Sequence, residues 1–211
     1  MQIKLLSISP DFLKTIWIAA RTCYSPESPI EISEQEMAER EMLRLARHVI
    51  SQEHHSVLEH CQMTYAVKNV SRTLLAQYSR HRIAVSLSVQ SQRYVNEQSA
   101  KNEAGLFDFI IPRSAQKSAE AQAVFLDAMR CAQTAYDKLV ACGVAREDAR
   151  FVLPGAAGTN FVTSLNLRSF LDIYKKRVLH KGAQWEIREM ILTMKNLLVE
   201  KEPWLAEYFA E

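Results

Sequence analysis

Apolar residues in this chain recur mostly at the three- and four-residue spacing of helices. Helices are predicted over residues 9–24, with Ser9 as N-cap and Pro10 in the first turn, and over 33–51, with Ser33 and Glu36 as a capping box. Further helices are predicted over 71–82, over 114–142 with Gly143 closing it, and just before Pro154. Two more follow in the segments 167–178 and 187–198.

Alternating apolar and polar positions are confined to short segments. Residues 62–68 place Met63, Tyr65 and Val67 on one face, residues 106–112 alternate through Phe107 and Phe109, and residues 3–8 are a candidate first strand. Few strands among many helices predict an α+β fold, in which a small antiparallel sheet packs with several long helices. No repeat, low-complexity tract or linker divides the chain, so residues 1–211 are predicted to form a single domain.

The distribution of charge adds a local feature that the apolar pattern does not show. The formal net charge is only +2, yet residues 61–96 contain neither Asp nor Glu. This stretch is predicted to hold an anion, and the alternative is a solvated basic surface, in which acids are usually interspersed. The bases that contribute its charge of +5 are Lys68, Arg72, Arg80, Arg82 and Arg93.

Side chains around Arg80 are suited to holding such an anion. On the predicted helix, Gln77, Arg80 and His81 would share one face, and a guanidinium with an amide suits a phosphate and a base edge. The chain has only five glycines and no phosphate-binding glycine loop, so side chains would hold a nucleotide. A second basic segment covers residues 166–178. A continuous helix there would bring Asn166 and Arg177 near one face, roughly 16 Å apart.

Serines, cysteines and histidines give weaker indications of chemistry. The serines near residue 90 have no positioned base and are predicted to bind rather than attack. Four scattered cysteines without a C-x-x-C pair predict reduced thiols in a cytoplasmic protein, and no apolar run predicts a membrane span. Residues 54–61 hold three His, one Glu and one Cys without a zinc-binding spacing, so no metal site is predicted. A metal-dependent hydrolase stays open as an alternative.

Together the motifs resemble those of flavin-dependent thymidylate synthases. RHR at 80–82, followed by eight residues and then Ser91 in SQRY, is similar to the family signature. AARTCYS, HSVLEH, EDARFVLP, NLRSF and AQWEIRE resemble further family segments in the same order, so the resemblance covers nearly the whole chain. The sequence departs from the family pattern at Val57, where proline is usual, and at Asp172, where asparagine is common. Val89 or Gln90 stands in the place of an acidic residue, in a spacer one residue longer than in many members.

The resemblance implies an enzyme that makes dTMP from dUMP without a cysteine nucleophile. FAD reduced by NADPH would supply the hydride, and 5,10-methylenetetrahydrofolate would supply the carbon. Family members are homotetramers with active sites built from several subunits, and neither nucleic acid nor a membrane is an expected partner. The competing interpretation of the basic stretch, a nucleic-acid-binding module, would need a more extended positive surface.

By motif position, the resemblance also assigns residues to ligands. Arg177 would be the catalytic residue that polarises the pyrimidine. The folate-facing residues would be His54 and Tyr94. The dUMP contacts would be Gln77, Arg80, Gln90, Ser91, Gln92, Arg93, Arg150 and Arg177. The FAD contacts would be Ser56, Arg80, His81, Arg82, Asn166, Arg168 and Asp172.

Overall fold

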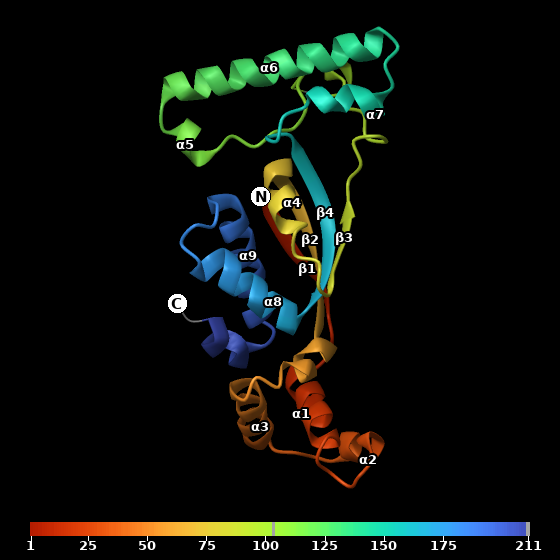
Figure 1. Cartoon of the computed structure of the whole chain (residues 1–211), viewed down its shortest axis with the longest axis vertical. Helices are drawn as coiled ribbons and strands as arrows, with labels where there is room; N and C mark the ends of the chain where they lie inside the picture. The colour runs from red at the N-terminus through yellow and green to blue at the C-terminus, as the bar shows by residue number, and fades with distance from the viewer. Residues whose placement is uncertain (103, 210–211) are drawn as a thin grey trace. The chain divides into compact units, whose positions relative to one another are not determined.

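The computed structural model describes residues 1–102 and 104–209 (Figure 1). Its antiparallel sheet has the strand order β1-β2-β4-β3 and is accompanied by many helices, which confirms the predicted α+β class. The strands are β1 (Gln2–Ile8), β2 (Gln62–Ser71), β3 (Val85–Val89) and β4 (Gly158–Asn166). Contacts divide the chain into two compact units. Unit 1 comprises Met1–Gln2, Val67–Arg80 and Ser88–Val162, and unit 2 comprises Ile3–Ala66, His81–Leu87 and Thr163–Glu211.

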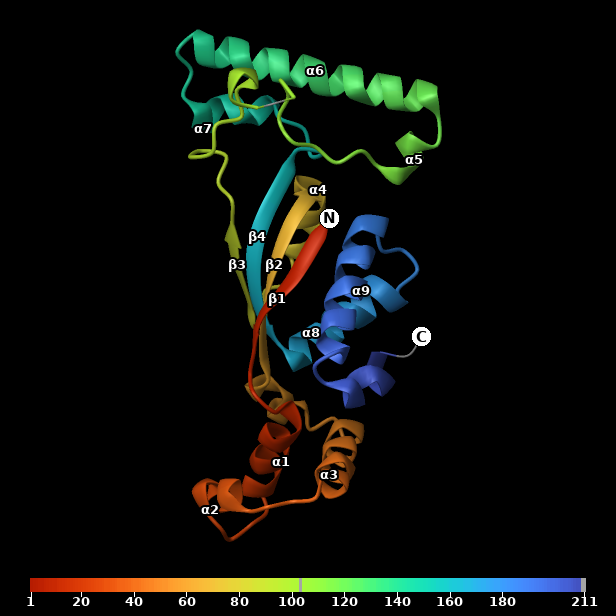
Figure 2. The same cartoon turned by 180° about the vertical axis from the view of Figure 1, so that it is seen from behind.

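Unit 1 is built around one long helix. Its helices are α4 (Arg72–Tyr78), α5 (Arg113–Gln116), α6 (Ala119–Ala141) and α7 (Arg146–Ala149), with 3₁₀ turns at Ser99–Lys101 and Arg150–Val152. Helices α6 and α7 lie side by side in both views (Figure 2). A small apolar core forms where Phe107, Met129 and Ala157 meet. The amide of Phe107 donates to the buried Gln133 side chain at 2.6 Å, which fixes this segment on α6.

Unit 2 carries the remaining helices. These are α1 (Phe12–Thr22), α2 (Pro29–Glu34), α3 (Glu39–Ser51), the 3₁₀ helix η1 (His55–His60), α8 (Leu167–Tyr174), the π-helical turn η4 (Lys175–Leu179), α9 (Trp185–Val199) and the 3₁₀ helix η5 (Pro203–Phe209). Aromatic rings join α8 to η5, since the Phe209 ring centroid lies 4.9 Å from that of Tyr174 and 5.7 Å from that of Phe170. The Tyr174 hydroxyl donates to the Phe209 carbonyl at 2.9 Å, so this buried polar group is satisfied. None of the helices in the described parts of the chain is long and apolar enough to cross a membrane.

Strand predictions were confirmed where alternation was clear. Met63, Tyr65 and Val67 are all buried on one face of β2, and β1 covers the candidate first strand. The strand predicted at 106–112 is wrong: only an isolated bridge joins Phe109 to Ala157. The backbone of this segment does not form a regular strand ladder. The Phe107 amide donates to the Gln133 side chain, and the Ile110 amide donates to the Ala156 carbonyl. Strands β3 and β4 were not predicted.

Helix boundaries were predicted less well at the N-terminal end. The helix predicted over 33–51 is two helices, and the capping box is formed by Ser28 and Glu31. Ser33 instead donates to the Ile30 carbonyl at 2.7 Å, so the predicted box of Ser33 and Glu36 is wrong. Helix α1 is capped by Asp11 rather than Ser9, because the amide and hydroxyl of Ser9 bond to the Gln62 carbonyl.

Two further helix boundaries differ from the prediction, and the first of them concerns residues of the site. Helix α4 ends at Tyr78, so Arg80 and His81 lie beyond it, and the shared helical face predicted for them with Gln77 is wrong. The helix predicted over 114–142 is interrupted before Ser118, whose side chain caps α6. Its predicted C-terminal signal is confirmed, since Gly143 has φ +85, a conformation that favours glycine.

Candidate active site

The residues predicted to form the site divide between the two units. Unit 1 holds Gln77, Arg80, Gln90, Ser91, Gln92, Arg93, Tyr94 and Arg150, which include every predicted dUMP contact except Arg177. Unit 2 holds His54, Ser56, His81, Arg82, Asn166, Arg168, Asp172 and Arg177. The predicted nucleotide group and most of the predicted flavin group are therefore two separate sets of side chains, each with its own geometry.

In unit 1, the segment after β3 is fixed on β4. The amide of Gln90 donates to the Asn160 carbonyl at 2.9 Å, and its side-chain oxygen accepts from the Asn160 amide group. A tight turn follows, in which the Ser91 carbonyl accepts from the amide of Val95 at 3.0 Å and the Ser91 hydroxyl accepts from that of Arg93 at 3.2 Å. Gln92 is buried. Gln90 thus serves the backbone arrangement, while the turn presents Ser91 and Arg93.

Two arginines of this group share one acidic residue of α7. The Nε of Arg93 lies 2.7 Å from an Oε of Glu147, and the Nε of Arg150 donates to the Glu147 carbonyl at 2.9 Å. Each bond uses Nε alone, so the terminal nitrogens of both guanidinium groups keep their hydrogen-bonding capacity for a ligand. Glu147 therefore orients two forks that suit a phosphate.

A third arginine, Arg72, belongs to this group although no motif pointed to it. Its Nη2 donates to the Gln90 carbonyl at 3.3 Å, and its buried Nε has no hydrogen-bond partner among the described residues. Burial, and next the positive charge of Arg150, lower the pKa of Arg72, and Glu97 opposes this shift. In the sequence, Arg72 is only one of several bases in the stretch without acids. The signal that could have singled it out is its position directly after Ser71, the N-cap of α4. A buried donor beside a like charge is the environment that an anion would relieve.

The remaining unit 1 residues lie at its surface. Gln77 donates to the Thr73 carbonyl at 3.4 Å within α4, and Arg80 is exposed beyond the helix end. Tyr94 is 80% exposed, with the guanidinium of Arg93 5.7 Å from its ring centroid. An aromatic ring this exposed beside a guanidinium is available to a ligand or to another subunit.

In unit 2, Arg177 and His81 meet directly. The Nε of Arg177 donates to the Nε2 of His81 at 2.9 Å, in a partly buried position. Burial lowers the pKa of His81, the charges of Arg177 and Lys176 lower it further, and Asp172 opposes them. Because Nε2 accepts this bond, the imidazole is neutral and its proton is on Nδ1.

Arg177 lies in the π-helical turn η4 that continues α8. The His180 amide donates to the Lys175 carbonyl at 3.2 Å, a bond that spans five residues. The continuous α-helix that would have placed Asn166 and Arg177 near one face is therefore wrong, because Asn166 is the N-cap and the α-helix ends at Tyr174. Such turns often occur at functional sites. Arg177 is half-buried in this turn.

The start of α8 holds the chain that follows the RHR motif. Buried Asn166 accepts the Ser169 amide at 2.9 Å through its side-chain oxygen, and the Ser169 hydroxyl donates to the Ile83 carbonyl at 2.9 Å. Ala84, next in the chain, has φ +50, a left-handed conformation unusual for alanine. The loop after His81 and Arg82 is therefore tied to α8 on one side and strained on the other.

The other unit 2 residues are paired or exposed. Arg168 forms an ion pair with Glu59, and Asp172 pairs with Lys176 at 2.7 Å. His54 and Ser56 are exposed at the start of η1. Within the described parts of the chain, no three His, Cys, Asp or Glu side chains gather closely enough to hold a metal ion.

A family model described as thymidylate synthase complementing protein matches residues 4–204. The chain belongs to the flavin-dependent thymidylate synthase family. A flavin-dependent thymidylate synthase of Clostridium tetani is 33% identical, over 99% of this chain and 86% of the relative. That of Geobacter sulfurreducens is 36% identical, over 94% of this chain and 82% of the relative.

Solved structures share the fold of this flavin-dependent thymidylate synthase family member. The UMP/dUMP methylase PolB of Streptomyces cacaoi, solved with 5-Br dUMP, superposes with a TM-score of 0.78 at 23% identity and covers 99% of this chain and 94% of its own. Thymidylate Synthase X of Helicobacter pylori, solved with FAD and dUMP, gives 0.77 at 21% identity and covers 100% of both chains. The fold of the chain, like its sequence, is thus similar to that of these proteins.

Proposed function

We propose that this chain catalyses the reductive methylation of dUMP to dTMP, with carbon from 5,10-methylenetetrahydrofolate and hydride from FAD that NADPH reduces. Membership in the flavin-dependent thymidylate synthase family supports this reaction. The observation that supports it most directly is the 2.9 Å hydrogen bond between Arg177 and His81. It joins the residue expected to activate the pyrimidine to the RHR motif expected to hold the flavin, across 96 positions of sequence.

The arginine group of unit 1 would bind the phosphate of dUMP. Arg93 and Arg150 are oriented through their Nε atoms by Glu147, and Arg72 contributes a buried donor that lacks a partner among the described residues. Bidentate guanidinium groups bind phosphate with a fixed geometry, which lysine cannot reproduce. The Ser91 hydroxyl, in the same turn as Arg93, would donate a further bond.

Arg177 would stabilise charge on the pyrimidine. A guanidinium is a permanent cation, and His81 fixes the position of this one by accepting a hydrogen bond from its Nε. A positive charge in a partly dry position favours the electron-rich form of the pyrimidine, in which C5 attacks the one-carbon unit. Neutral His81 holds this group without adding a competing charge.

The unit 2 residues fit FAD in their chemistry. A dinucleotide pyrophosphate needs cationic donors, and Arg82 and Arg168 would supply them where no glycine loop exists. When bound, FAD supplies the hydride that converts the added carbon to a methyl group. Asn166 would use its amide nitrogen toward the cofactor, because its oxygen is committed to the helix cap.

Other parts of the assignment stay proposals. The homotetramer with shared active sites is supported by large apolar side chains left exposed beside the predicted ligand residues, with Ile83 at 86% and Phe151 at 82% exposed. The roles of His54, Ser56 and Tyr94 toward folate and flavin rest on motif position, whereas a cytoplasmic location rests on the four scattered cysteines.

The decisive experiment measures dTMP formation by the FAD-loaded protein from dUMP, methylenetetrahydrofolate and NADPH. Arg177→Ala should keep its fold and its flavin spectrum but lose about a hundredfold in turnover, because electrostatic stabilisation of this kind is worth ~3 kcal/mol. Arg177→Lys should recover only part of the rate, since an ammonium lacks the planar fork. Lys175→Ala, an exposed cation in the same turn, is the matched control and should remain active.

Two results would contradict the proposal at different levels. Near-normal turnover in folded Arg177→Ala protein would move the activating role to Arg150 or Arg93. Absence of dTMP from flavin-loaded wild-type protein would overturn the proposed reaction itself.

A further inference from the structure

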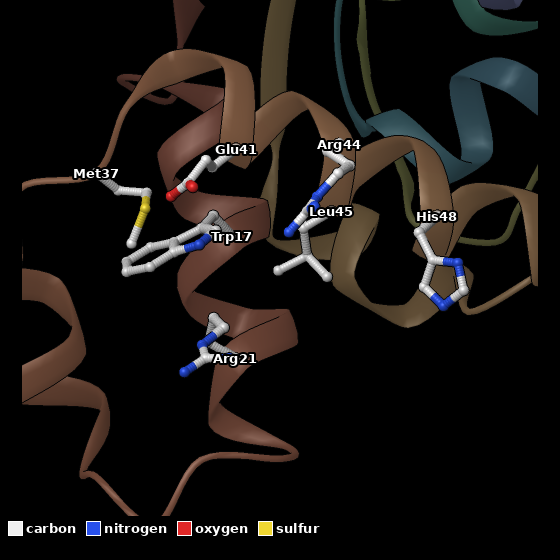
Figure 3. Close-up of a pocket in the computed structure, with 7 residues that line it drawn as sticks. All are labelled: Trp17, Arg21, Met37, Glu41, Arg44, Leu45 and His48. Atoms are coloured by element: carbon white, nitrogen blue, oxygen red, sulfur yellow. The ribbon is translucent and has the colours of Figure 1, made fainter.

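A pocket outside all the predicted site residues lies between α1 and α3 of unit 2 (Figure 3). Its volume is about 510 Å³, within the range of small-molecule sites. Trp17 and Arg21 line it from α1, one helical turn apart. From α3 it receives Glu41, Arg44, Leu45 and His48, whose spacing places them on one face of the helix. Arg21 belongs to the AARTCYS motif, to which no function has yet been assigned.

The polar groups of this pocket are mostly donors. Arg44 reaches from α3 toward α1, where Arg21 lies, and His48 lies at the end away from Met37 (Figure 3). The side chains of Arg21, Arg44 and His48 form no hydrogen bond or ion pair with any described residue. By contrast, Arg47 on another face of the same helix pairs with Glu207 at 2.9 Å. Two uncompensated guanidinium groups beside one pocket favour an anionic ligand.

The pocket also has an apolar surface. Trp17 is buried beneath it, and half-buried Leu45 and Met37 form its sides. Met37 comes from the segment between α2 and α3, the break that separates the two helices. Methionine adapts to the shape of a flat ring, and ligand pockets typically combine such apolar walls with a few polar groups.

Charge limits what can lie at the Met37 end. Glu41 lies beside Met37, and its carboxylate has no hydrogen bond or ion pair with a described residue (Figure 3). A second anionic group there would meet a like charge. The ligand should therefore carry its negative charge at one end only.

We propose that this pocket binds a planar apolar ring that carries one terminal carboxylate or phosphate. The anion would lie between Arg21 and Arg44, and the ring would lie against Leu45 and Met37. This second site is distinct from the residues proposed for dUMP and FAD and does not depend on the proposed reaction.

The test is calorimetric titration of the full chain, saturated with FAD and dUMP, at low ionic strength. The probes are 2-naphthoate and 2-naphthyl phosphate, with inorganic phosphate as the anion without a ring and 2-naphthol as the ring without an anion. Both naphthyl anions should bind, and the tighter of the two shows whether the pocket prefers a carboxylate or a phosphate. The two controls should bind at least tenfold more weakly.

Variants locate the binding. Arg21→Gln and Arg44→Gln should each weaken the naphthyl anions about tenfold without changing the melting temperature, because both side chains are exposed and unpaired within the described residues. Arg40→Gln removes the same charge from α3 outside the pocket and should change the affinity less than twofold. Glu41→Gln should tighten the binding of the naphthyl anions, because it removes a negative charge from the pocket. This variant tests the proposal by a gain of affinity and not by a loss.

Three outcomes would overturn the proposal. Equal weakening in Arg40→Gln would mean unspecific attraction by surface charge. Inorganic phosphate binding as tightly as naphthyl phosphate would remove the role of the apolar wall. Naphthyl binding that appears only when dUMP and FAD are left out would place these probes in the active site.

Discussion

His81 is a small group with a large influence, because one imidazole nitrogen holds Arg177. Burial and the neighbouring cations Arg177 and Lys176 lower its pKa in the folded protein, and Asp172 opposes them incompletely. A base with a lowered folded pKa stabilises the fold above its ordinary pKa of about 6.5. That stabilisation is lost as the pH falls through the lower, folded value. Protonation would also remove the acceptor for Arg177.

We therefore expect the free energy of unfolding to fall between pH 7 and pH 5, and to fall less in His81→Gln, which accepts a bond at any pH. Urea unfolding of both proteins at several pH values measures this difference. His180→Gln, an exposed histidine of the same unit, is the control and should keep the wild-type pH dependence. The same slope in wild type and His81→Gln would show that the shift of His81 has no thermodynamic consequence.

Arg72 offers a second prediction, at the anion group of unit 1. Because its buried Nε lacks a partner among the described residues and Arg150 lies near, a bound phosphate should satisfy it. Arg72→Gln should raise the KM for dUMP about tenfold, since a charge-assisted hydrogen bond is worth ~1.5 kcal/mol or more, and should change kcat little.

The matched control for Arg72 is Arg130→Gln, which breaks an exposed ion pair with Asp127 in the same unit and should change neither constant. A second readout is thermal: phosphate should raise the melting temperature of wild type more than that of Arg72→Gln. Equal KM values in wild type and Arg72→Gln would assign Arg72 to the backbone of the Gln90 turn alone.

Helix α8 depends on Asn166, which acts as its cap and is also a predicted flavin contact. Asn166→Ala should cost ~1 kcal/mol of stability, the usual value of a lost N-cap, whereas Asn166→Ser should restore most of it. Both variants lack the amide nitrogen. If that nitrogen contacts the flavin, both should bind FAD more weakly while only the alanine variant is less stable, as denaturant unfolding and flavin titration would show. A fully stable Asn166→Ala protein would contradict the capping role.

Sequence patterns predicted elements better than their ends. Helices with one apolar stripe were found near their predicted places because burial of that stripe decides them. Ser28 and Ser33 both precede an acidic residue by three positions, so the true cap depends on where the backbone turns, which composition does not encode. β4 was missed because its buried positions include polar Thr159 and Thr163 while apolar Val162 is exposed, which hides the alternation.

The candidate site shows the same limit. Motifs predicted which residue types matter, and Arg177 with His81 were both among them. Their contact, and that of Arg168 with Glu59 across 109 positions, depends on the fold and not on local spacing. Arg72 had no motif, because its role follows from burial beside Arg150.

The four cysteines decide whether catalysis could use a thiol. Cys23, Cys131 and Cys142 are exposed, and burial raises the pKa of the Cys61 thiol to about 12, so this thiol is protonated at neutral pH. A variant with Cys61→Ala and serine at the other three positions should keep dUMP-dependent turnover per bound flavin within a few-fold of wild type. Complete loss in a folded, flavin-loaded variant would show that catalysis needs a thiol.

The two compact units are interleaved along the chain. The chain passes from one to the other after residues 2, 66, 80, 87 and 162, so neither unit is a continuous stretch of sequence. Strands β2, β3 and β4 each contribute residues to both. Neither unit can therefore be excised by one cut, and the single domain over residues 1–211 stays a prediction.

The order of the strands along the chain also determines when each strand can pair during synthesis. β2 ends at Ser71, and its sheet neighbour β4 begins at Gly158, so 87 positions (158 − 71) separate them. At ~5–20 residues per second, the edge of β2 that receives β4 waits roughly 4 to 17 s after it emerges. An open strand edge is a site for wrong pairing. While the long helix α6 is being translated, the nascent chain therefore exposes an unpaired edge of β2.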